Sequence, residues 1–222
     1  MKYIYHHLGL GDHIICNGLV RRLIQKNSKY GIFTKEHNVD SVSFMYRDLT
    51  NLKVIPIIDD STIIEYKDKE IMLIGHGNLP IVIQQHGCLW DEAFYKQMNI
   101  DFSERWNSFY YEKDTKKEKG LFDNLNPNKE KFALIHNEDS TGTDRIDYSK
   151  INPDLKQIFV KKSETIFDYG FLISMATEVH CIDSSFKHLV DSLPTMGKLF
   201  YHKNFKPRTS LDHNYRKKWI II

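Results

Sequence analysis

The stretch Tyr3-Ile-Tyr-His-His-Leu-Gly-Leu-Gly-Asp-His13, which runs on into Ile14-Ile-Cys-Asn-Gly-Leu-Val-Arg-Arg-Leu-Ile24, decides how the chain begins to fold. A short apolar segment leads into two glycines, Gly9 and Gly11, that stand one residue apart. Apolar residues then recur at every fourth position: Ile15, Leu19 and Leu23. This pattern predicts a strand, a tight turn and a helix, with Asp12 at or near the helix N-cap.

Two physical reasons favour glycine in such a turn. Glycine adopts positive φ without strain, and it lets a ligand approach bare backbone. The turn also leaves backbone N–H groups at the positive end of a helix dipole, with the carboxylate of Asp12 beside them. We therefore expect the turn either to bind a ligand or to cap the helix.

The composition is that of a folded protein without a strong net charge. Of the 222 residues, 41% are hydrophobic and 13% are aromatic, which excludes a disordered chain and suffices for one large domain or two small ones. The formal net charge is +2, so no bulk positive field would recruit nucleic acid. The sequence has neither a signal peptide nor an apolar run near the ~20 residues that cross a bilayer. We expect a soluble, cytoplasmic protein with no nucleic-acid partner and no transmembrane segment.

The three cysteines, Cys16, Cys88 and Cys181, are widely spaced and odd in number. Their spacing fits neither a zinc site nor a disulfide framework. Each has apolar neighbours in the sequence, which predicts reduced thiols in the core.

In the first half, strand-length apolar segments alternate with spacers long enough for helices. After the first helix, the predicted strands are residues 30–34, 53–58 and 70–74. The alternation predicts a parallel sheet covered on both faces, which binds ligands at the carboxyl ends of its strands. The loops at residues 9–13 and 75–78 both follow strands, so we place both at that edge.

Helices are predicted between and after these strands. One covers residues 38–45, and Asp59-Asp60-Ser61 caps another that continues through residue 66. Residues 89–97 form a helix rich in aromatic side chains, and residues 100–111 are extended towards their end. The strongly charged run at residues 112–120 is the one pronounced shift in composition. We place the domain boundary there and expect domains at residues 1–112 and 113–222.

The alternation restarts in the second half. Strands are predicted at residues 131–136, 157–160, 179–182 and 198–201, and helices at residues 165–176 and 183–193. The basic, aromatic tail to residue 222 can pack back onto the first half. The fold class expected is α/β, with two Rossmann-like parallel-sheet domains that face each other across a cleft. Asp12 and Ser184 would then lie on opposite walls.

A second group of polar residues stands where the predicted strand at 179–182 runs into a helix: Asp183, Ser184, Ser185 and His188. Hydroxyl groups at a helix start leave N–H donors for phosphate oxygens, and the dipole adds about 0.3–1 kcal/mol per anionic charge. The alternative is that Ser184 only caps the helix and that His188 is an interior residue. A loop with Gly142 and Arg145 favours phosphate binding, because guanidinium pairs with phosphate bidentately.

Together these features resemble the lipopolysaccharide heptosyltransferase family, whose members have the GT-B glycosyltransferase fold. The family's N-terminal Gly-x-Gly-Asp is matched by Gly9, Gly11 and Asp12. Its C-terminal Asp-Ser-Gly-x-x-His is matched by Asp183, Ser184 and His188. The resemblance covers these two motifs and the order of the elements.

The sequence departs from the family pattern at three points. Ser185 stands where the family has glycine, which could narrow the diphosphate site. Arg145 only loosely replaces the lysine that the family uses beside the phosphates. The chain is also much shorter than a usual GT-B enzyme. The identities of donor and acceptor therefore do not carry over.

The resemblance implies a metal-independent, inverting sugar transfer from a nucleotide-diphosphate donor to a glycan or other hydroxyl acceptor, with no cofactor. In the first half, Asp12 would be the general base, a role worth about 10²–10⁴ in rate. His13 would touch the acceptor or the donor phosphate. The donor would be held by residues of both motifs and two loops: Gly9, Gly11, Arg145, Thr165, Asp183, Ser184, Ser185 and His188. Within this set, Thr165 would lie near the base and ribose.

The acceptor side is expected at the same edge of the first half. His76 lies in a glycine-flanked loop. Trp90, Asp91 and Tyr95 could form the acceptor wall, because sugars stack on aromatic faces. A core or interdomain contact is the alternative for these three residues. The remaining histidines singled out are interpreted as structural: His6, His7 and His180. The sequence has no Asp-x-Asp metal motif, and we interpret Asp59-Asp60 as a helix cap.

Three other functions are compatible with parts of this pattern. A shortened GT-B-like protein could bind a nucleotide or glycan without turning it over, and an epimerase of the GT-B type would use a similar site. A nicotinamide-dependent oxidoreductase would need a third glycine three residues after the second, where this chain has Ile14. It would also need an acid at the end of the second strand, where Thr34 and Lys35 stand, although Glu36 is close.

Overall fold

The computed structural model describes residues 1–138, 146–161, 165–203 and 213–222. The chain divides into two compact units, and each is described by itself. The first comprises Met1–Glu112 with Leu211–Asn214, and the second comprises Lys113–Ser210 with Tyr215–Ile222. No helix in the described part of the chain is both long and apolar enough to cross a bilayer.

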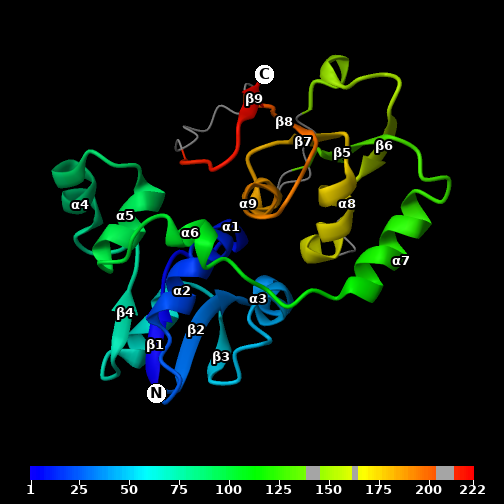
Figure 1. The fold of residues 1–222 in the computed structure, drawn as a ribbon. Helices are drawn as coiled ribbons and strands as arrows, with labels where there is room; N and C mark the ends of the chain where they lie inside the picture. The colour runs from blue at the N-terminus through cyan, green and yellow to red at the C-terminus, as the bar shows by residue number, and fades with distance from the viewer. Residues whose placement is uncertain (139–145, 162–164, 204–212) are drawn as a thin grey trace. The chain divides into compact units, whose positions relative to one another are not determined.

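The first unit contains a four-stranded parallel sheet (Figure 1), in the order β3-β2-β1-β4. Its strands are β1 (Lys2–Tyr5), β2 (Tyr30–Lys35), β3 (Leu52–Ile57) and β4 (Ile71–Leu73). Its α-helices are α1 (Leu10–Ile15), α2 (Asn17–Leu23), α3 (Val39–Met45), α4 (Leu79–His86), α5 (Trp90–Gln97) and α6 (Glu104–Asn107). Two 3₁₀ helices, η1 (Glu36–Asn38) and η2 (Asp60–Tyr66), complete it. The predicted parallel sheet is confirmed.

The core of this sheet follows from the alternation of side chains along β1. Tyr3 and Tyr5 point to one face, because successive residues of a strand alternate. They pack there with Phe33 and Ile57. The 3₁₀ helix η2 adds Tyr66, whose ring lies edge-on to Tyr3 at 5.1 Å between centroids. The predicted cap before η2 is confirmed, since the carboxylate of Asp59 accepts a hydrogen bond from Ser61 N.

Of the two reasons for glycine in the first turn, positive φ does not apply at Gly9. Gly9 has φ −70°, and the described glycines with positive φ are Gly75, Gly77 and Gly87. Glycine at position 9 has a steric reason instead, because a Cβ there would lie 2.6 Å from Oδ2 of Asp12. The stretch at residues 100–111, predicted to be extended towards its end, also contains the short helix α6, and its last residues, 109–111, belong to no helix or strand.

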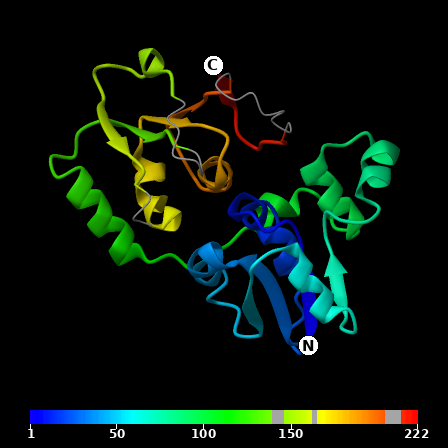
Figure 2. The same cartoon turned by 180° about the vertical axis from the view of Figure 1, so that it is seen from behind.

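The second unit contains a five-stranded parallel sheet, in the order β6-β5-β7-β8-β9. Its strands are β5 (Phe132–His136), β6 (Lys156–Phe159), β7 (Glu178–Cys181), β8 (Lys198–Tyr201) and β9 (Trp219–Ile221). Its helices are α7 (Thr115–Leu125), η3 (Tyr148–Lys150), η4 (Ile166–Tyr169), α8 (Gly170–Met175) and α9 (Ser185–Ser192). The view from behind shows α7 running beside α8 (Figure 2).

Two features of the second unit differ from the sequence analysis. Most of the charged run at residues 112–120 belongs to the helix α7, whose cap Asp114 accepts a hydrogen bond from Lys117 N. The tail does not simply pack on the first half. His213 and Asn214 belong to the first unit, but Trp219–Ile221 extends the second sheet as β9.

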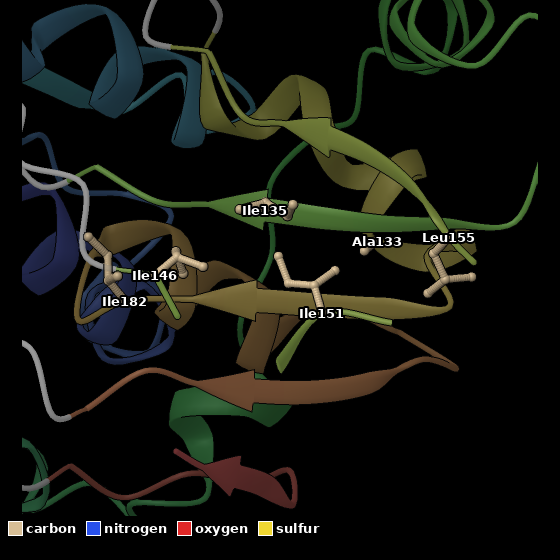
Figure 3. Close-up of a cluster of buried hydrophobic side chains, with 6 residues drawn as sticks. All are labelled: Ala133, Ile135, Ile146, Ile151, Leu155 and Ile182. Atoms are coloured by element: carbon tan, nitrogen blue, oxygen red, sulfur yellow. The ribbon is translucent and has the colours of Figure 1, made fainter. Parts of the chain in front are cut away.

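On the second sheet, side chains from residues 146–155, which precede β6, pack against β5 (Figure 3). Ile146, Ile151 and Leu155 from this segment pack against Ala133 and Ile135 of β5. Ile182, which follows β7, joins the same cluster. The three cysteines are free and buried, as the sequence predicts.

Candidate functional site

The order of the strands places a ligand-binding position in each sheet. In open parallel sheets, ligands bind outside the carboxyl ends of the strands where the strand order reverses. In the first sheet that reversal lies between β1 and β4, and in the second between β5 and β7. The turn at residues 9–12 and the loop at residues 75–78 follow β1 and β4. Residue 136 ends β5, and residues 183–185 follow β7. The two motifs therefore stand at the reversal points of the two sheets.

Asp12 is the third residue of α1, one turn from the N-cap Gly9. Its carboxylate folds back towards the start of the helix, where the backbone N–H of Gly9 hydrogen-bonds to it. Desolvation raises the pKa of the Asp12 carboxyl to about 6, although His7, this hydrogen bond and Lys35 each lower it. The result is a half-buried carboxylate that is ionised at neutral pH and is more basic than an ordinary aspartate.

His13 follows Asp12 in α1 and is fully buried. Its ring meets His6 edge-on, with 4.3 Å between centroids. Desolvation lowers the pKa of His6 to about 4 and that of His13 well below its ordinary value. Neither ring nitrogen of His13 has a hydrogen-bond partner among the described residues. Both histidines are therefore neutral near pH 7.

An aromatic cluster surrounds the loop after β4. The His76 ring stacks on Tyr5 at 4.6 Å and 7°, and it lies 4.8 Å from His7. The Tyr5 hydroxyl donates a hydrogen bond to Asp60. Trp90 is half-buried and packs edge-on against Phe94 at 4.7 Å. Nε2 of His76 and Nε1 of Trp90 are buried without a hydrogen-bond partner in the part of the chain described.

Asp91 and Tyr95 are core residues of the first unit, which fits the structural alternative. Asp91 is fully buried and forms an ion pair with the equally buried Arg105. Its carboxylate also accepts hydrogen bonds from the backbone and side-chain nitrogens of Asn214, both at 3.0 Å. The Tyr95 hydroxyl donates to Ile15 O at 2.7 Å. Asp91 thus ties α5 to α6 and to the tail rather than presenting a free carboxylate.

In the second unit, Ser184 is the N-cap of α9. Its φ and ψ are −162° and 167°, and its Oγ accepts a hydrogen bond from Lys187 N at 3.5 Å. Ser185 is the first residue of the helix, and His188, 5% exposed, lies one turn in. The first N–H groups of a helix have no partner within it. The start of α9 therefore offers donors next to a hydroxyl group, as the sequence predicts.

Sequence reasoning missed Lys187. Its side chain is completely buried, and its Nζ lies 2.7 Å from Oδ1 of Asp183 and 3.6 Å from the centre of the Tyr201 ring. Desolvation lowers the pKa of Lys187, while Asp183 raises it. Asp183 and Lys187 are four residues apart, a spacing that brings opposite charges together on one face of a helix, so the ion pair could have been predicted from the sequence. The ion pair offsets the negative charge of Asp183 at the start of α9.

His136 was also missed. It ends β5, beside the loop that follows β7, and its Nδ1 lies 3.3 Å from Oγ of Ser184. Its ring stacks on Phe186 at 5.1 Å and 9°. Only the pairing of β5 with β7 brings these residues together, so spacing in the sequence gave no signal.

Of two further residues predicted to bind the sugar donor, Thr165 begins one of the described ranges and Arg145 lies outside them. Thr165 is the N-cap of η4, and its Oγ1 is buried without a partner among the described residues. Arg145, with Gly142, lies outside the described residues.

The second unit also contains a pocket of about 430 Å³, lined by residues that include Phe122, Phe171 and Met175. It lies beside Phe132 and Thr177, where β5 and β7 begin. That is the amino edge of the sheet, opposite His136 and Ser184, so this pocket is separate from the candidate site.

No protein-family model matches the sequence, and no curated protein matches it either. Two solved structures share its fold. E. coli ADP-heptose LPS heptosyltransferase II superposes with a TM-score of 0.56 at 11% identity, over 100% of this chain and 90% of the other. A glycosyl transferase of family 9 from Veillonella parvula DSM 2008 gives a TM-score of 0.57 at 9% identity, over 100% and 86%. The chain therefore has a heptosyltransferase-like GT-B fold, and at these identities the likeness concerns the fold alone.

Proposed function

We propose that this chain is a glycosyltransferase that moves a sugar from a nucleotide-diphosphate donor to a hydroxyl acceptor, with inversion and without a metal ion. The premise is the fold that it shares with two solved glycosyltransferases. The observation that carries the proposal is Asp12, a half-buried carboxylate with a raised pKa at the reversal point of a parallel sheet.

Asp12 is suited to act as a general base. A catalytic base works best when its pKa lies near the working pH, and desolvation brings the pKa of this carboxyl to about 6. In the proposed step, the acceptor oxygen attacks the anomeric carbon and its proton passes to the Asp12 carboxylate. The bond from that carbon to the diphosphate oxygen breaks on the opposite face. A single displacement of this kind inverts the anomeric configuration.

The donor would be held at the start of α9. The negative charge that develops on the leaving diphosphate is stabilised by a helix N-terminus and by hydroxyl donors. Ser184, Ser185 and His188 would contact the diphosphate, and the ion pair of Asp183 with Lys187 limits repulsion there. We also assign to the donor Thr165 near the base and ribose, Arg145 beside the phosphates, and the backbone at Gly9 and Gly11.

In this proposal the two units bind different substrates. We assign the acceptor side to residues 1–112 and the nucleotide-sugar side to residues 113–222. His76 and Trp90 remain the acceptor-side residues of the proposal, because their ring nitrogens find no partner among the described residues. His13 would touch the acceptor or the donor phosphate, and its ring, neutral because desolvation lowers its pKa, adds no charge beside the base.

A thermal-shift panel of nucleotide-diphosphate sugars tests this proposal, since ligand binding raises the melting temperature by mass action. We expect at least one to stabilise the chain more than its nucleoside monophosphate. With an acceptor present, nucleoside diphosphate should then be released. Binding without release would favour a non-catalytic binding protein, and interconversion of the donor sugar would favour an epimerase. No stabilisation by any member of the panel would contradict the proposal.

A further inference from the structure

We propose that His136 is a positioning residue of the donor site that responds to pH. When protonated, it holds the oxygen of Ser184 and leaves the Ser184 proton for a phosphate oxygen of the ligand. The inference rests on the proposed function, because it concerns the same donor site. It adds a residue and a proton-controlled step that the sequence motifs do not contain.

The geometry fixes the His136 ring against α9. The imidazole stacks on Phe186, the second residue of the helix, with 5.1 Å between centroids and 9° between planes. Its Nδ1 faces Oγ of Ser184 at 3.3 Å. His136 is the last residue of β5 and Ser184 follows the end of the neighbouring β7, so both stand at the carboxyl edge of the sheet, at its reversal point. The contact therefore lies where a ligand of this fold class binds.

The Ser184 hydroxyl has one proton and two lone pairs. One lone pair accepts the cap hydrogen bond from Lys187 N. The proton has two possible acceptors within 3.3 Å, the Ile182 carbonyl and an unprotonated Nδ1 of His136. With neutral His136 accepting at Nδ1, the Ser184 proton is shared between these two protein groups. It then points away from an incoming ligand.

Protonation of His136 changes this arrangement. Nδ1 becomes a donor and takes the second lone pair of Ser184 Oγ. The hydroxyl proton can then turn from the Ile182 carbonyl to a phosphate oxygen. The imidazolium adds a positive charge beside the start of α9, and hydrogen bonds in a charged network are about twice as strong as neutral ones. The donor site thus binds anions more tightly at lower pH.

Other groups near this contact also titrate or carry charge. Asp183 and Lys187 form an ion pair on the same loop and helix, and His188 lies one turn into α9. Glu138 follows β5 two residues after His136. Asp12 in the first unit titrates with a pKa of about 6. All of these are unchanged by a substitution at position 136, so a comparison of variants at the same pH isolates His136.

The test is isothermal titration with ADP-glucose, UDP-glucose and GDP-glucose at about pH 5.5 and about pH 8, the range over which histidine changes charge. A sugar ester carries no phosphate monoester with a second ionisation near about pH 6, so the probe itself does not titrate. For the wild-type protein we expect the affinity to be about 10-fold higher at the lower pH, or about 1.4 kcal/mol.

His136→Asn places an amide near the position of Nδ1 but carries no charge. At about pH 8 its affinity should stay within about twofold of wild type, and the gain at about pH 5.5 should fall below about threefold. His86→Asn removes an exposed histidine at the end of α4 and should keep the full gain. A thermal melt reports whether each variant folds, and His136→Gln replaces His136→Asn if the latter does not.

The outcomes separate this inference from the proposed function. Binding of a nucleotide sugar with no gain at low pH, or a full gain in His136→Asn, would overturn the role of His136 alone. The absence of binding to all three nucleotide sugars at both pH values would overturn the donor site itself, and the role of His136 with it.

Discussion

The Asp12→Asn variant distinguishes between two roles for Asp12, a catalytic general base and a helix cap. The side-chain amide can still accept the hydrogen bond from the Gly9 N–H, so the turn should persist. Donor affinity should also persist if the donor is held by the second unit. Turnover should fall by about 10²-fold or more, because asparagine cannot take the acceptor proton. The assay is release of nucleoside diphosphate in the presence of donor and acceptor.

The same variant has a predicted effect on stability. The folded-state pKa of about 6 exceeds the ordinary aspartate value of about 3.9. Folding therefore favours the protonated carboxyl, and the contribution of Asp12 to stability falls as pH rises from about 4 through about 6. Asparagine removes this cost, so the free energy of unfolding at about pH 8 should rise by about 1–2 kcal/mol after solvent screening is discounted. Near pH 3.5, where both states are largely protonated, about the same stability is expected.

Urea denaturation at the two pH values measures this effect. A simple cap predicts nearly unchanged turnover and no gain in stability. A variant that keeps more than about half of wild-type turnover would refute the base assignment, and we would then move the base to His13.

Three further predictions concern buried ionisable side chains, and each can be followed by urea denaturation. Lys187→Met should lower the free energy of unfolding by about 2–3 kcal/mol, because it leaves a partly buried carboxylate unpaired; an unchanged midpoint would show that the ion pair is not needed. Arg105→Met should lower the free energy of unfolding by about 3–5 kcal/mol, because it leaves the fully buried Asp91 without its cationic partner. A loss below about 1 kcal/mol would contradict the burial of that pair. The protein should lose stability as pH falls from about 6.5 to about 4. The pKa values of His6 and His202 are lowered to about 4 in the folded state, so over this range the unfolded chain binds protons that the folded protein does not. Stability that is constant over that range would contradict the lowered pKa values of both residues.

The sheets were predictable because their strands are short apolar runs separated by helix-length spacers. Residues 131–136 and 198–201 predict β5 and β8 to within a residue at each end. The last strand escaped prediction because Trp219–Ile221 is only three residues long and follows a polar, basic segment. Its place in the sheet depends on pairing with β8, which no local pattern contains.

The strongly charged run at residues 112–120 lies where the two units divide, between Glu112 and Lys113. Composition alone did not reveal the helix within it, in which Glu118 and Phe122, four residues apart, are both buried on one side of α7. A helix with one buried stripe tolerates many exposed lysines on its other faces. The charged residues of this run therefore belong to the solvent-facing side of a helix.

The candidate site was predictable only where its residues are neighbours in the chain. The cap at Ser184 and the position of Asp12 in the first turn of α1 follow from local spacing. Contacts made across the sheet were not foreseen. His136 contacts Ser184 because β5 and β7 are paired. Asp91 forms an ion pair with Arg105 and accepts a hydrogen bond from Asn214 in the core.

The central claim is that a nucleotide-diphosphate sugar binds at the start of α9. Isothermal titration of the wild type and of the Ser184→Ala/His188→Ala double variant, with the nucleotide sugar that stabilises the wild type most, tests it directly. Ser184 is the N-cap of α9 and His188 lies one turn into it, at the helix start where anions gather. The account predicts an affinity at least about 10-fold weaker in the double variant, which should still unfold cooperatively. An unchanged affinity would contradict the account, because the diphosphate would then be bound elsewhere.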